Sequence, residues 1–145
     1  MSFSTLIPYF RARLSAKHPD LSEWTDAFNV DNIPATKLNK AYHVELLPAN
    51  YVGTAHVILA FRAQVRVRVF VKGYAKPELA VDKATFYADS IIKECCKSTN
   101  RLTQPSIKNV LPISVDVKAL ALTNDNAAYL DLTFECTLML NPDAP

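Results

Sequence analysis

Glycine is scarce in this chain of 145 residues, which has only Gly53 and Gly73. Average usage of about 7% would give roughly ten glycines in a chain of this length. The sequence accordingly contains neither a GxGxxG nor a GxxxxGK[ST] pattern, so the glycine-rich phosphate-binding loops are excluded. The excess of positive over negative charge is also small, because the formal net charge is +2. That value alone does not indicate a nucleic-acid partner.

Cysteine and long apolar runs are limited as well. The three cysteines are an odd number, and Cys95 and Cys96 are adjacent, so the sequence does not resemble a disulfide framework. This composition favours the reducing cytosol. No stretch of 18 apolar residues occurs, and we therefore expect no membrane contact through a spanning helix.

The usual signatures of catalysis are missing from the sequence. His18, His43 and His56 form no HxH or HxxxH pair, and no GxSxG motif is present. The adjacent cysteines fall near the end of a predicted helix, where the helix dipole disfavours a thiolate. We therefore predict a protein that is not an enzyme, with no catalytic residue, no metal ligand and no cofactor.

Two runs alternate with a period of two, which is typical of strands with one buried face. The first is basic on its polar side and spans 61–72, and the second is acidic on its polar side and spans 128–140. Opposite charges on two strands of similar length favour cross-strand pairs in one sheet. The polar side chains concerned include Arg62, Arg66, Arg68, Asp131 and Glu135.

The remaining pattern completes an α+β prediction for a single domain over residues 1–145. Helical spacing predicts a helix over 4–16, with Ser4 as N-cap and Pro8 in the first turn. A second helix is expected from Pro77 to about Lys97. With strands at 42–47, 57–72, 113–122 and 127–140, the order is helix-strand-strand-helix-strand-strand. We expect a four-stranded, mainly antiparallel sheet with both helices packed on one face.

The charged sheet face admits three interpretations. It could be a solvated face with internal charge pairs, a subunit interface, or a nucleic-acid surface. The irregular segment 18–41 also admits two interpretations. Trp24, Phe28 and Ile33 could either complete the edge of the core or anchor a neighbouring subunit.

Several segments in order resemble the phage tail terminator and tail-completion proteins. They are the helix over 3–14, then EWTDAFN at 23–29, NIP at 32–34 and YHVE at 42–45, followed by a long strand ending in VFVKGY at 69–74 and a helix. The resemblance covers roughly residues 3 to 97. It implies a small α/β subunit that forms a hexameric ring. The ring caps the tail tube, ends its polymerisation and joins it to the head or neck.

The resemblance also implies partners and candidate interface residues. The expected partners are further copies of the chain, the tail tube protein and neck or connector proteins, with DNA only passing through the lumen. The expected location is the virion tail or neck, after assembly in the host cytoplasm. Subunit or tube contacts are then expected at Trp24, Phe28, Asn32, Ile33 and Tyr51. The ring interface or lumen is expected at Arg62, Arg66, Arg68, Asp131 and Glu135.

Two alternatives stay open at the level of sequence. A head-to-tail connector, or neck subunit, would share the ring but bind the portal side. A small nucleic-acid-binding module or an unrelated small enzyme would not form a ring. The sequence does not determine which face of the sheet would line a channel.

Overall fold

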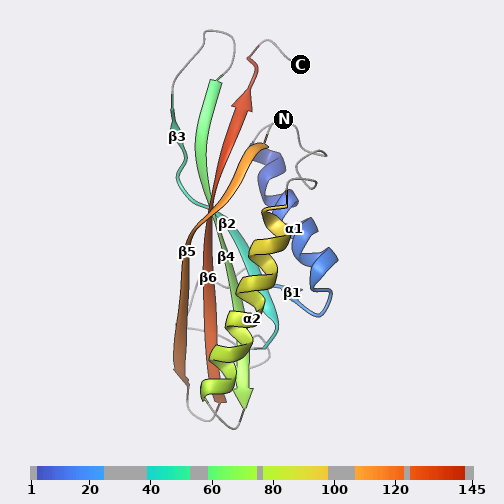
Figure 1. The fold of residues 1–145 in the computed structure, drawn as a ribbon, viewed down its shortest axis with the longest axis vertical. Coiled ribbons are helices and arrows are strands. Elements are labelled where there is room, and N and C mark those ends of the chain that lie inside the picture. Colours follow the sequence, from blue (N-terminus) through green and yellow to red (C-terminus); the bar gives the residue numbers. More distant parts are fainter. Residues whose placement is uncertain are drawn as a thin grey trace.

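The computed structural model describes residues 3–24, 39–52, 59–74, 77–97, 107–122 and 125–142. Within them, two helices cover one face of a twisted sheet, as Figure 1 shows. The predicted α+β class is confirmed. A short 3-10 turn, Phe3–Thr5, leads into α1 (Leu6–Lys17), and α2 is Pro77–Cys95. The strands are β1 (Ser22–Glu23), β2 (Ala41–Leu46), β3 (Asn50–Tyr51), β4 (Leu59–Tyr74), β5 (Ile107–Leu122) and β6 (Asp125–Leu140).

The sheet has six strands in the order β1-β2-β4-β6-β5, with β3 paired to β4 beyond the end of β2. The predicted four-stranded, mainly antiparallel sheet is therefore wrong in its number of strands. The four long strands are antiparallel neighbours as expected, but β1 adds a parallel pair with β2. Both additional strands have two residues. Strands that short leave no periodicity, so sequence patterns do not reveal them.

The helix-facing side of the sheet carries the main core. From β4 it takes Ala63, Val65, Val67, Val69 and Val71, each at most 1% exposed, as the alternation predicts. The corresponding face of β6 is also buried and contributes Phe134, whose ring lies 5.1 Å from that of Phe10 in α1. Both helices pack on this face, which confirms their predicted placement.

The helix starts follow the proline pattern. Pro77 is the first residue of α2, and Pro8 lies in the first turn of α1, where a missing N–H removes no helical hydrogen bond. The N-cap prediction is wrong, because Thr5 rather than Ser4 occupies that position and its side chain makes no capping bond. The preceding 3-10 turn moves the start of α1 along the chain.

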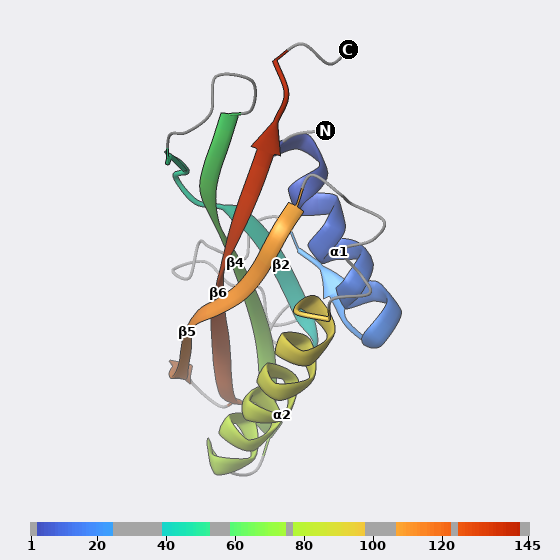
Figure 2. The same ribbon diagram turned by 45° about the horizontal axis from the view of Figure 1, so that its top comes forward.

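Strand β5 begins earlier than predicted, at Ile107 instead of Ile113, and it contains Pro112. Proline lacks the N–H that a central strand needs, but an edge strand tolerates it. β5 is the terminal strand of the order, and its register with β6 shifts between Pro112 and Ser114. Figure 2 shows β5 at one margin of the sheet beside β6.

Lys40 is the non-glycine residue with positive φ in the described part of the chain, at 58°. This left-handed conformation is uncommon for a residue with a Cβ. Here it lets the Lys40 N–H donate to the Phe70 carbonyl while its own carbonyl accepts from the Ser22 N–H, both at 2.8 Å. Lys40 thereby ties β1 and the start of β2 to β4.

Candidate functional site: the polar face and edges of the sheet

The polar face of the sheet brings together the charged residues that the sequence singled out. Arg62, Arg66 and Arg68 on β4 lie on the same face as Asp131 and Glu135 on β6. The β4–β6 register places Arg68 directly opposite Asp131. The pairing of a basic with an acidic strand is therefore as predicted.

Arg68 and Asp131 form the most enclosed ion pair on this face, with side chains only 9% and 13% exposed. Arg68 Nε donates to Asp131 Oδ1 at 2.6 Å and its Nη2 donates to Oδ2 at 2.7 Å. The guanidinium also lies over the Tyr129 ring, 4.4 Å from its centroid. Burial lowers the pKa of Arg68, but the hydrogen bond and charge of Asp131 outweigh it and the pKa is raised.

The other two arginines have different partners. Arg66 donates to Glu45 on β2, not to a carboxylate of β6. Arg62 pairs with Glu135, with Nε and Oε1 3.3 Å apart and the Arg62 side chain 57% exposed. Each arginine thus faces a carboxylate. A surface with matched charges attracts phosphates less than three unmatched arginines would.

A second small core lies on the polar face. It consists of Trp24, Ala41, Phe70 and Tyr129, all buried. The Trp24 and Phe70 rings are 5.5 Å apart, and the Phe70 and Tyr129 rings are 6.0 Å apart. Of the two interpretations left open for Trp24, its position favours completion of the core edge over an exposed anchor.

The other predicted contact residues are Phe28, Asn32, Ile33 and Tyr51. Phe28, Asn32 and Ile33 lie outside the described residues. Tyr51 on β3 is 55% exposed, and its ring is 5.6 Å from that of Phe61. Tyr51 is therefore available for a contact with another molecule.

Comparisons with known proteins leave the geometry as the main guide to function. No family model matches the chain, and no curated protein matches it. Within the described ranges, no helix is long and apolar enough to cross a membrane. In the same part of the chain, no three His, Cys, Asp or Glu side chains converge as a metal site requires.

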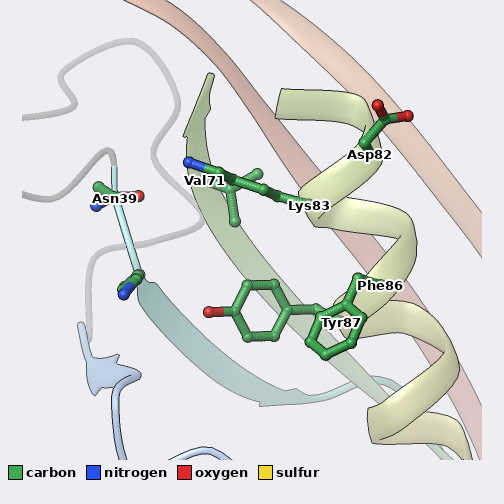
Figure 3. A pocket seen from close by; sticks show the side chains of 7 residues that line it. Asn39, Val71, Asp82, Lys83, Phe86 and Tyr87 are labelled. Atoms are coloured by element: carbon green, nitrogen blue, oxygen red, sulfur yellow. The ribbon is translucent and has the colours of Figure 1, made fainter. Parts of the chain in front are cut away.

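A hollow of about 370 Å³ lies between α2 and the β2–β4 side of the sheet (Figure 3). Phe86, Tyr87, Asp82 and Lys83 reach it from α2, and Val71 from β4; Asn39 and Lys40 complete its lining. Lys83 Nζ donates to the Lys72 carbonyl at 2.9 Å, which fixes the amine at the sheet. The hollow combines aromatic rings with amines, but its polar groups do not converge on a single point.

No pattern in the sequence indicates a polar cluster between the two helices. His18 follows α1 and is buried, and its Nε2 is hydrogen-bonded to Ser90 Oγ on α2 at 2.8 Å. Tyr87 donates to Asp20 Oδ2 at 2.6 Å, and Asp20 Oδ1 lies 4.0 Å from His18 Nδ1. His18 and Ser90 are 72 residues apart in sequence, so only the packing of α1 on α2 brings them together.

The cluster predicts a loss of stability in mild acid. Burial lowers the pKa of His18, against the raising effect of Asp20; Lys17 and Glu94 are the other charges near it. The unfolded chain therefore binds a proton at His18 at a higher pH than the folded protein does. The free energy of unfolding should fall as the pH decreases from about 6.5, the ordinary histidine pKa, towards the lower folded value.

Urea unfolding from pH 7.5 to 5 would measure this effect. The His18→Gln variant should show a shallower decline. An NMR titration that gives His18 a pKa at or above its ordinary value would contradict the prediction. Asp20 acts in a separate, more acid range, because the hydrogen bond from Tyr87 lowers its pKa.

Exposed apolar side chains other than Tyr51 are the feature that sequence reasoning missed. The described residues include eight large hydrophobic side chains that are exposed, and six of them lie at the margins of the sheet. They are Leu46, Tyr51 and Val52 beside β2 and β3, and Leu111, Ile113 and Val115 on β5. The alternation of β5 does predict a strand, but only the strand order shows that β5 is at the edge.

Proposed function

We propose that this protein is a structural subunit that assembles into a closed ring, caps a phage tail tube, ends its polymerisation and joins it to the head or neck. The observation that carries the proposal is the pair of exposed apolar margins on one sheet. Exposed apolar patches that are surrounded by polar residues are typical of protein interaction sites. The order of segments that resembles tail terminator proteins supplies the specific role.

Two different margins on one subunit favour a ring over a simple dimer. A two-fold dimer uses the same patch on both subunits, whereas head-to-tail association uses two different patches and forms a ring when the rotation between copies closes. The margin at Leu111 and Val115 and the margin at Leu46 and Tyr51 are separate surfaces of this kind. Both are available on every copy.

The matched charges of the polar face suit a channel wall through which DNA passes. Within the described part of this face, Arg62 pairs with Glu135 and Arg66 pairs with Glu45, so positive and negative charges alternate there. Binding to a phosphate backbone depends on the number of phosphates that are neutralised. A face with paired charges would therefore let DNA slide. This supports the polar face as the lumen side of the proposed ring.

The decisive experiment is the solution mass of the purified protein across a concentration series, with negative-stain images of the same samples alone and with tail tubes. We expect closed hexameric rings, or a cap at one end of the tube, and no further tube growth from capped ends. A strict monomer that does not bind tubes at any concentration would contradict the proposal. A ring that binds the portal end and ignores tubes would instead establish a connector.

A further inference from the structure

Strand β5 is a long edge with apolar side chains on its exposed part. Among the described strands, β6 is its one neighbour, so a row of backbone N–H and C=O groups faces outward. Leu111 and Val115 are 55% and 53% exposed. An edge of this kind is a template for pairing with another strand.

The opposite margin also has backbone available for pairing. β1 covers β2 only at Ala41 and Tyr42, so within the described strands the segment 43–46 pairs on one side alone, with β4. This margin carries the exposed Leu46, and β3 continues it with Tyr51. It is therefore a second edge with apolar side chains.

The two edges lie at the same level of the sheet. Leu46 is opposite Val65, which is opposite Phe134, which is opposite Pro112. In the same way, the rung of His43 passes through Arg68 and Asp131 and reaches Asp116 on β5. The segment 43–46 thus shares its rungs with the segment 112–116.

Strand direction also fits a continuous sheet. β2, β4, β6 and β5 alternate in direction, so β2 and β5 are antiparallel to each other. Rotation of a copy about an axis along the strands places β5 of one subunit beside β2 of the next. The junction is then antiparallel, like the other long pairs, and every copy keeps its helices on the same side of the sheet.

Side-chain character agrees with this junction. At zero stagger, His43 and Asp116 share a rung on the polar face, so an imidazole faces a carboxylate. The pairing ends at this rung, because β1 already lies beside Ala41 and Tyr42, and β5 of the neighbouring copy must turn away from β2 after Asp116. Leu46 enters beside Pro112 and Ile113. Two β5 strands paired with each other would instead leave Leu46, Tyr51 and Val52 exposed.

We propose that the occupant of the β5 edge is the 43–46 segment of β2 in a second copy of this chain, which makes one sheet continuous around the ring. This inference rests on the proposed function and names its subunit contact. It assigns the contact to main-chain pairing in addition to apolar side chains, as in strand addition to a sheet edge.

Cross-linking of paired cysteines tests the contact. In a Cys96→Ser background, the double variant Glu45→Cys/Ser114→Cys, whose two positions share a rung and the polar face, is treated with a short bis-maleimide, alone and with tail tubes. We expect a ladder of covalent oligomers up to the closed ring. The control pair Leu79→Cys/Ser114→Cys places one thiol on α2, away from both edges, and should give no ladder.

The possible results separate the contact from the function. Rings without a ladder, or covalent dimers from Ser114→Cys alone, would overturn the edge pairing while the ring remains. Monomers with and without tubes would overturn both. As an independent check, Val115→Lys should weaken self-association at least about tenfold because edge lysines oppose strand pairing, while Leu79→Lys should leave it unchanged.

Discussion

Replacement of Asp131 by alanine is expected to lower the free energy of unfolding by about 3 kcal/mol, the lower end of the range for breaking a buried ion pair. The reason is the Arg68 guanidinium, which would stay on a covered surface without its two charge-assisted hydrogen bonds. Tyr129 still offers its ring face, but a cation–π contact at a partly covered site contributes only about 1 kcal/mol. Urea unfolding monitored by circular dichroism would measure the loss.

The exposed pair on the same face supplies the matched control. Glu135→Ala removes the partner of Arg62, whose side chain is 57% exposed. Water replaces that carboxylate, and we expect a loss below about 1 kcal/mol. Removal of both charges in Arg68→Met/Asp131→Leu should recover most of the stability lost in Asp131→Ala. Equal losses for Asp131→Ala and Glu135→Ala would show that the Arg68 pair is not enclosed.

Replacement of Trp24 by alanine is the second change with a large expected effect, a loss of about 3 kcal/mol in the free energy of unfolding. Trp24 is buried against Phe70, and its removal would open a cavity beside Ala41 and Tyr129. The loss should be independent of protein concentration, because it arises within one subunit. Unfolding curves at two concentrations below the onset of association would show this.

Tyr51→Ala provides the contrast with Trp24→Ala. Because Tyr51 is more than half exposed, its loss should change the unfolding free energy of the monomer by no more than about 1 kcal/mol. The same variant should weaken ring formation if the β3 margin is an interface. A Trp24→Ala protein that unfolds like the wild type but fails to associate would restore the interpretation of Trp24 as an intersubunit anchor.

The faces of the long strands could be predicted because alternation is a local property. Val65, Val67 and Val69 face the helices, and Arg62, Arg66 and Arg68 face the other way, whatever strands lie beside them. The start of α2 could also be predicted from the local sequence, because Pro77 suits a first helical position. Opposite charge on two strands also sufficed to predict that β4 and β6 meet.

The charge partners and the burial of Trp24 depended on more distant parts of the chain. Arg66 pairs with Glu45 because β2 lies on one side of β4 and β6 on the other. No pattern within 61–72 contains that order. The contact between His18 and Ser90 likewise requires α1 to pack on α2.

The sequence by itself determined the class of the fold, the position of the two helices, and which side of each long strand is apolar, because these depend on the spacing of side chains along the backbone. Only the tertiary structure decided that β5 is an edge strand and that Val115 is exposed. The alternation of apolar residues in β5 resembles that in β6, whose apolar side chains are buried. A side chain is buried by what lies next to its strand, and strand order is set by contacts between residues far apart in the chain. The candidate assembly surface is therefore a product of topology.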